Sequence, residues 1–110
     1  MRKVAVTFDN SDVLEVEDID ILKFNSDAFK IIEGEGDIVA RIIISEEVWA
    51  VFRKKCGMDF LEETANGNFI WGATIEVIPN CPRIMFLSGD YIMPAEEIIK
   101  SGVINVWSRW

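Results

Sequence analysis

The hydrophobic pattern of this chain changes its period at Ser45, and this change constrains the fold more than any other feature of the sequence. Apolar and polar residues alternate through residues 3–8, which is the period of a half-buried strand. In residues 46–56 the apolar side chains instead recur at helical spacing, at Val48, Trp49, Phe52 and Cys56. The chain therefore combines strands with an amphipathic helix, and we expect an α+β fold.

The first 44 residues predict a β-meander, a series of antiparallel strands joined by short turns. Its strands are expected at residues 3–8, 13–17, 19–24, 28–33 and 38–44. Between them lie segments rich in Asp, Asn, Ser and Gly, which favour turns, at residues 9–12, 25–27 and 34–37. Arg41 is expected on an outer or edge face of its strand. Strands at this spacing predict an antiparallel sheet or a small, partly open barrel.

The remaining residues predict two helices and more strands. Ser45 is a good N-cap for a helix over residues 46–56, and Gly57 is a good C-terminal cap. The elements expected after it are a linker at 58–68, a strand at 69–78, a turn at 79–82, a returning hairpin strand at 83–87, a short helix from Pro94 to Gly102 and a last strand at 103–107. We expect six to eight strands in a single domain, residues 1–110.

The net charge of −8 comes entirely from about one quarter of the chain. Residues 9–37 hold ten acids and two bases, whereas the rest of the chain holds nine of each. Such a field repels nucleic acids and membrane surfaces, and it attracts basic partners over about 8–10 Å. We therefore expect a protein partner with a basic surface and no direct contact with nucleic acid or membrane. The apolar runs, such as residues 42–44, are far short of the roughly 20 residues of a membrane span.

The absence of histidine argues against a histidine-dependent hydrolase and an ordinary zinc site. Histidine is absent, which removes the usual general base near neutral pH and the commonest zinc ligand. The spacing of Asp9, Asp12, Asp18 and Asp20 does not match a calcium-binding loop. We expect no catalytic residue, no metal and no cofactor. An enzyme that uses carboxylates such as Asp9, Asp12 or Glu76 is a third hypothesis.

The two cysteines, Cys56 and Cys81, do not form a Cys-x-x-Cys motif. A disulfide between them is left open, although a secreted scaffold would carry more cysteines. Lys54 and Lys55 would favour a thiolate at Cys56, but its place on the apolar face of a helix favours a core thiol. No apolar signal-peptide core follows the first residues, so we expect a cytoplasmic protein.

Four tryptophans are many for a chain of 110 residues. Trp49 and Trp71 lie on predicted apolar faces and are expected in the core. Trp107 and Trp110 flank Arg109, and tryptophan and arginine are the residue types most enriched in binding hot spots. The alternative is that this segment folds back onto the sheet.

One segment resembles a pattern in tailed-phage proteins. It comprises Asn68-Phe69-Ile70-Trp71-Gly72-Ala73-Thr74-Ile75-Glu76-Val77-Ile78-Pro79, followed by Cys81-Pro82 and Gly89-Asp90-Tyr91. In those proteins an aromatic-glycine strand leads to a proline turn, and the returning strand ends in Gly-Asp-aromatic. The segment is similar to part of the phage major capsid fold and to small phage accessory proteins. The resemblance covers about a quarter of the chain and implies a phage or mobile-element origin, without assigning any functional residue.

Two hypotheses for function follow from the charge and the apolar residues. In the first, the chain is a small acidic, non-enzymatic module that binds a basic protein surface, for example as an inhibitor of a host nucleic-acid-handling system. Its expected contact residues are Asp12, Glu15, Glu17, Asp18, Asp20, Trp107, Arg109 and Trp110. In the second, it is a phage structural or assembly subunit that contacts its own copies or a virion. A simpler interpretation of the acids is that they are solvated residues of strands and turns.

Overall fold

The computed structural model describes residues 4–10, 21–56, 61–64, 67–70 and 72–101. The elements in these ranges are β1 (Ala5–Asp9), α2 (Ile21–Gly34), β2 (Val39–Ile44), α3 (Glu46–Cys56), β3 (Leu61–Thr64), β4 (Gly67–Ile70), β5 (Ala73–Val77), β6 (Arg83–Ser88) and α4 (Ala95–Ser101). No helix in the described ranges has the length and apolar character needed to cross a membrane. The strands predicted at 13–17 and 103–107 lie outside the described residues.

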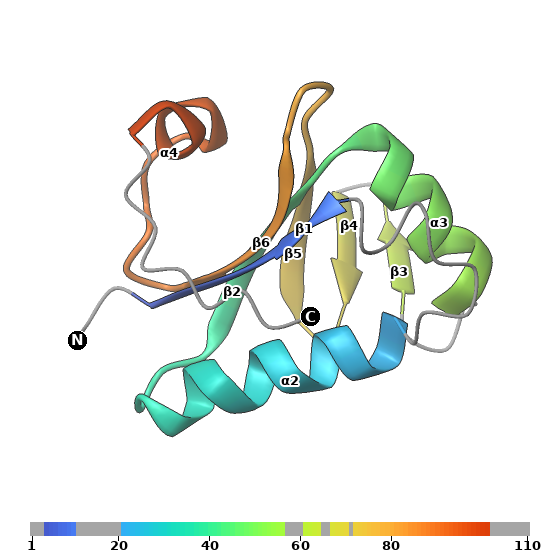
Figure 1. Cartoon of the computed structure of the whole chain (residues 1–110). Helices are drawn as coiled ribbons and strands as arrows, with labels where there is room; N and C mark the ends of the chain where they lie inside the picture. The colour runs from blue at the N-terminus through green and yellow to red at the C-terminus, as the bar shows by residue number, and fades with distance from the viewer. Residues whose placement is uncertain (1–3, 11–20, 57–60, 65–66, 71, 102–110) are drawn as a thin grey trace.

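The strands in the described ranges form one sheet in the order β1-β6-β2-β5-β4-β3. Neighbouring strands are antiparallel except β2 and β5, which run parallel with Ile42 opposite Ile75. The sheet is open, with β1 at one edge and β3 at the other (Figure 1). The predicted α+β class is therefore confirmed. Of the two predicted architectures, an antiparallel sheet or a small, partly open barrel, an open sheet forms, and it is mixed because β2 and β5 run parallel.

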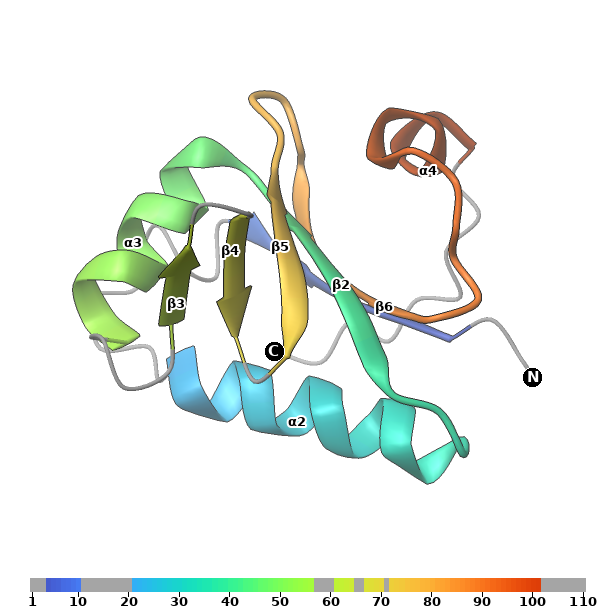
Figure 2. The same cartoon turned by 180° about the vertical axis from the view of Figure 1, so that it is seen from behind.

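Helices cover both faces of this sheet, and the central strand β2 contributes to both cores. The helical residues of the first core come from α2 and α3, and they are Ala28, Ile32, Val48 and Phe52. The second core holds Ala95 and Ile98 of α4. Ile42 and Ile44 belong to the first core and Ile43 to the second, and none of the three is exposed. Figures 1 and 2 show α4 standing apart from α2 and α3.

The meander predicted before Ser45 is wrong from residue 21 to residue 34, where the chain forms helix α2. Within residues 21–34, helix α2 stands where the sequence predicts two strands, at 19–24 and 28–33, and a turn at 25–27. Ala28 and Ile32 are four residues apart, lie on one face of the helix and are fully buried. The polar residues 25–27 favour a turn locally. Burial of an apolar helical face against the sheet outweighs that local preference.

Residues 61–78 form three strands where the sequence predicts a linker and a single strand. β3 pairs with β4, and β4 pairs with β5, with Ile70 opposite Ala73. Gly72, directly before Ala73, has a φ of 83°. Glycine adopts this left-handed conformation without the strain of other residues, which allows the tight turn. Apolar residues keep alternating through the turn, so alternation does not reveal it.

The hairpin predicted between residues 69–78 and 83–87 is also wrong. β6 lies between β1 and β2, so β2 separates it from β5. The connection passes the end of β2, where the Ile78 N–H donates a hydrogen bond to the Ile44 carbonyl at 2.8 Å. Crossing one intervening strand takes about 10 Å, which residues 78–82 can span. The two strands that the phage resemblance implies as partners are therefore not neighbours.

The two helices predicted after Ser45 are confirmed as α3 and α4. Ser45 caps α3 as predicted, because its Oγ accepts the Val48 N–H at 3.2 Å. Trp49 is half-buried and packs against the first core, close to its predicted role. The Pro94 carbonyl accepts the Glu97 N–H at 3.0 Å and so opens the first turn of α4. The caps predicted at Gly57 and Gly102 lie outside the described residues.

Arg41 connects β2, β5 and the loop that leads to α4. Its Nε and Nη2 donate to the Glu76 carboxylate, at 2.5 Å to Oε2 and 2.9 Å to Oε1. Its Nη1 donates to the Tyr91 carbonyl at 2.8 Å and to the Met93 carbonyl at 2.6 Å. The Arg41 side chain is only 17% exposed, so the predicted outer or edge position is wrong. A paired, half-buried arginine is stable in a central strand because its N–H groups have acceptors.

Replacing Arg41 with alanine is expected to destabilise the fold by about 2–4 kcal/mol, since it removes these bonds and leaves Glu76 without its partner. Urea unfolding measures the loss. The matched control is Arg83→Ala, which removes an exposed arginine from β6 and is expected to cost less than about 0.5 kcal/mol. Equal losses in the two variants would show that the Arg41 contacts contribute no more to stability than an exposed charge.

Candidate functional site

The residues predicted to bind a partner lie outside the part of the chain that the structure describes. They are Asp12, Glu15, Glu17, Asp18, Asp20, Trp107, Arg109 and Trp110. Half of the acids in the acidic stretch, residues 9–37, nevertheless lie within the described residues. They are Asp9, Asp27, Glu33, Glu35 and Asp37. The last three of these acids follow one another at the C-terminal end of α2 and in the turn after it. This end of α2 is the candidate site.

The turn after α2 is fixed by backbone hydrogen bonds that cap the helix. The Gly36 N–H donates to the Glu33 carbonyl at 2.9 Å, and the Asp37 N–H donates to the Ile32 carbonyl at 3.2 Å. This pair of bonds is the Schellman arrangement, in which the residue after the helix adopts a left-handed conformation. Gly36 has a φ of 82°, as this arrangement requires. The cap holds Asp37 and Ile38 at the entrance to β2.

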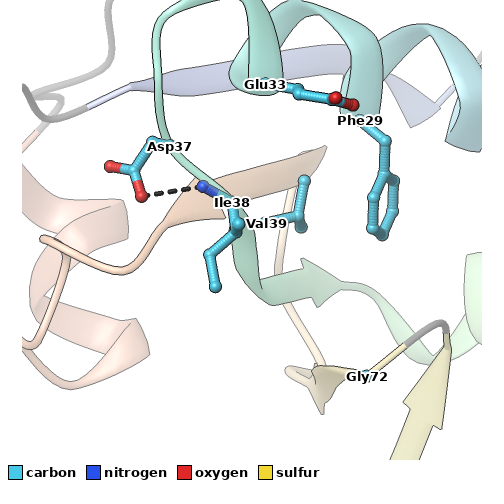
Figure 3. Close-up of a pocket in the computed structure, with 6 residues that line it drawn as sticks. All are labelled: Phe29, Glu33, Asp37, Ile38, Val39 and Gly72. Atoms are coloured by element: carbon cyan, nitrogen blue, oxygen red, sulfur yellow. Dashed lines mark hydrogen bonds between the residues drawn. The ribbon is translucent and has the colours of Figure 1, made fainter.

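A cleft of about 460 Å³ opens where α2 ends and β2 begins. Its lining residues are Phe29, Glu33, Asp37, Ile38, Val39 and Gly72. Figure 3 shows the Phe29 ring hanging from α2 beside Val39, with Gly72 across the gap. The Glu33 carboxylate points towards the side of Phe29, and Asp37 lies at the opposite end. The Asp37 carboxylate turns away from Phe29 and Val39, with one oxygen bonded to the Ile38 N–H, so the cleft has mostly apolar walls with Glu33 on the side of Phe29.

The two carboxylates of the cleft differ in their surroundings. Glu33 is exposed, and it makes no ion pair or hydrogen bond through its side chain with the described residues. Asp37 is only 8% exposed, and its Oδ1 accepts the Ile38 N–H at 2.8 Å. Its Oδ2 is buried and has no hydrogen-bond partner among the described residues. Such an orphan carboxylate oxygen is uncommon in a folded protein and calls for an explanation.

The charge at this end of α2 opposes the helix dipole. The C-terminal end of a helix is its negative pole, and basic residues are favoured there. The last turn of α2 contains no basic residue, and Glu33 adds a negative charge to it. Lys30 lies three residues before Glu33, but the two make no ion pair in the described structure. The helix end therefore presents negative charge that its own structure does not neutralise.

The lining of this site combines apolar side chains with an exposed carboxylate, that of Glu33. Within the described ranges, no three acids or cysteines approach one another closely enough to hold a metal ion. Apolar walls with few polar groups are typical of small-molecule and side-chain binding clefts. The acids of this site belong to the predicted acidic stretch. Phe29, Val39 and Gly72 come from three separate segments, and only the fold brings them together.

Replacing Gly36 with alanine is expected to destabilise the protein by about 1 kcal/mol, because alanine strains at a φ of 82°. A methyl group there would meet no atom within 4 Å, so the cost is one of backbone conformation alone. Gly34→Ala is the control, since Gly34 also has open space but belongs to the helix. It is expected to stabilise by about 0.5–1 kcal/mol. Thermal unfolding of both variants measures the two changes in stability. If both variants are stabilised, or both are destabilised, the cap at Gly36 is contradicted.

Cys81 is a buried free thiol whose surroundings do not activate it. Burial raises the pKa of the Cys81 thiol, which disfavours the reactive thiolate. Its Sγ donates a hydrogen bond to the Arg83 carbonyl at 2.8 Å. The Cys81 carbonyl accepts the Asn10 Nδ2 at 2.7 Å, which ties the turn before β6 to the end of β1. Cys81 is therefore a structural residue, and it forms no disulfide.

The raised pKa of Cys81 predicts a loss of stability at alkaline pH. Below about pH 8.5 the thiol is protonated in both states, and above it the unfolded chain loses the proton first. The free energy of unfolding should therefore fall as pH rises from about 8.5 to 10. Burial also raises the pKa of Tyr91, so part of the fall persists without Cys81. Urea unfolding should show a flatter pH profile for Cys81→Ala, and identical slopes would contradict this assignment.

The comparisons with known proteins leave the geometry of the site as the guide to its function. All the residues that line the cleft, Glu33 and Asp37 among them, belong to the part of the chain that the structure describes. The chain matches no protein-family model, no curated protein and no solved structure.

Proposed function

We propose that this chain is a small acidic module that binds a protein partner through a basic surface of that partner. The contact surface is the acidic edge, which we define as Glu33, Glu35 and Asp37 at the end of α2 and in the turn after it. We place the protein in the cytoplasm and assign it a binding role rather than a catalytic one. An inhibitor of a nucleic-acid-handling protein fits this proposal, because such proteins present basic grooves.

The observation on which the proposal rests is the negative charge of Glu33 at the C-terminal end of α2, which no base of the described structure neutralises. No base lies in the last turn of α2, and Glu33 makes no ion pair with the described residues. Acids at the negative pole of a helix destabilise it by about 0.3–1 kcal/mol each. A basic partner would neutralise both these acids and the helix pole. Charge that is unfavourable in the free protein thus becomes favourable in a complex.

The reactive residues that the chain has and lacks support a binding role over a catalytic one. The sequence has no histidine to act as a base near neutral pH. Burial disfavours the thiolate of Cys81. The acidic edge lies beside a cleft with apolar walls, which is a usual setting for a bound side chain.

The test compares two double variants of equal net charge. Glu33→Lys with Glu35→Lys alters the acidic edge, and Glu96→Lys with Glu97→Lys alters α4 on the other face of the sheet. Both changes raise the net charge from −8 to −4. With a fluorescent lysine- and arginine-rich peptide as the probe, the first variant should lose at least about tenfold in affinity at low salt, and the second less than about threefold.

Stability provides the control for this comparison. The change at the acidic edge removes repulsion at a helix C-terminus and should leave the protein as stable as before or more stable. The change at α4 places lysines in the first turn of a helix and should destabilise it. Equal losses of affinity in both variants would refute the acidic edge as the contact surface.

A structural or assembly subunit is the second candidate, and two exposed apolar side chains favour it. Ile38 is 72% exposed and Ile92 is 87% exposed, and contact with another copy of the chain would cover these apolar side chains. In this case the protein would associate with itself, and the association would resist salt. Sedimentation of the unmodified chain, alone and with the basic peptide, at low and high salt distinguishes the two candidates. The first predicts a salt-sensitive complex with the peptide, and the second predicts salt-resistant association of the chain with itself.

A further inference from the structure

We propose that residues 89–101, which we call the strap, open and close as a unit over the second core, and that Arg41 is the latch that holds them closed. The strap comprises the loop after β6 and helix α4. This inference is independent of the proposed function and concerns the face of the sheet that α4 covers.

Few apolar side chains attach the strap to the sheet. Tyr91, Ala95 and Ile98 are buried, whereas Ile92 between them is 87% exposed. The other α4 side chains that the structure describes are exposed or half-buried. Figures 1 and 2 show α4 standing apart from α2 and α3, so the sheet is its support among the described elements. A segment with so few buried apolar contacts opens at a lower free energy than the centre of a protein.

Arg41 supplies a polar attachment between the strap and the sheet. Its Nη1 donates to the Tyr91 carbonyl at 2.8 Å and to the Met93 carbonyl at 2.6 Å. These two carbonyls flank Ile92, so one guanidinium group fixes both ends of this short loop. Its Nε and Nη2 donate to the Glu76 carboxylate of β5, which holds the guanidinium with Nη1 towards the loop. Hydrogen bonds from a charged donor are stronger than those between neutral groups.

A buried carboxylate oxygen at the start of the strap opposes closure. Asp90 lies in the turn that the Tyr91 N–H closes by donating to the Ser88 carbonyl at 3.2 Å. Its Oδ2 is buried and has no hydrogen-bond partner among the described residues. Water would bond to this oxygen in the open strap, so closure costs the hydration of a charged group. The bonds of Arg41 therefore favour the closed strap, and Asp90 favours the open one.

Opening of the strap would uncover apolar side chains of the sheet. Cys81 and Met85 are each 2% exposed and share the second core with Ala95 and Ile98 of α4. The Cys81 thiol therefore reports the opening, because an alkylating reagent reaches a buried thiol only when its cover is removed. In a Cys56→Ala background Cys81 is the remaining thiol of the chain.

The experiment combines amide hydrogen exchange with alkylation of Cys81 by iodoacetamide, both at low urea concentrations. The Ile98 N–H, which donates to the Pro94 carbonyl at 3.1 Å, should exchange at least about tenfold faster than the amides of β2. Its rate and the alkylation rate should depend only weakly on urea, because local opening exposes less surface than unfolding. Equal rates and equal urea dependence for α4 and β2 would overturn the strap.

Three variants test the latch. Arg41→Lys keeps the charge but loses the fork of donors, and it should raise both rates at least about tenfold. Asp90→Asn removes the buried charge and should lower both rates about threefold. Ile92→Ser, the control, changes the exposed side chain between the two bonded carbonyls and should alter either rate less than about twofold.

The latch is refuted if Arg41→Lys leaves both rates unchanged, or if Asp90→Asn raises them. Faster exchange at Ile98 without faster alkylation of Cys81 would mean that α4 frays without uncovering the second core, and it would refute the strap as a unit. Each rate is compared in the urea range where it depends only weakly on urea, so that a change in global stability does not produce the difference.

Discussion

The position of β2 at the centre of the sheet is the constraint on which the other elements depend. β2 pairs in parallel with β5 and antiparallel with β6, and helices cover it on both faces. Its run of three isoleucines therefore has no exposed member. Arg41 on the same strand adds a polar connection, because its guanidinium joins Glu76 of β5 to the loop before α4. β2 therefore links the two core clusters to each other and, through Val39, to the cleft.

Local signals in the sequence predict the parts of the fold that local interactions determine. Ser45 predicts its helix because an N-cap and an amphipathic pattern act within a few residues. Pro94 predicts α4 for the same reason. Helix α2 is missed because the polar residues 25–27 favour a turn locally, whereas burial of Ala28 and Ile32 against the sheet favours a helix. The order of the strands is missed because β2 enters between β5 and β6 through contacts that no short segment encodes.

The candidate site is predictable in its charge and unpredictable in its shape. The acidic stretch of residues 9–37 includes Glu33 and Asp37, so the sequence alone points to a basic partner. The cleft also needs Phe29 from α2 and Gly72 from a turn between two strands. Gly72 is placed there by the register of β4 and β5, which alternation does not show. The unfavourable charge at the end of α2 becomes visible only when residues 21–34 are known to be helical.

The pairing of β1 with β6 has a consequence for how the chain is made. Val4 and Ser88 are 84 positions apart and exchange two hydrogen bonds, from the Val4 N–H to Ser88 Oγ and from the Ser88 N–H to the Val4 carbonyl. A ribosome that adds about 5–20 residues per second needs roughly 4–17 s to cover that separation. During this time Val6 and Phe8 lack the strand beside which they are buried in the finished protein. β1 therefore joins the sheet only late in synthesis, after β6 has been made.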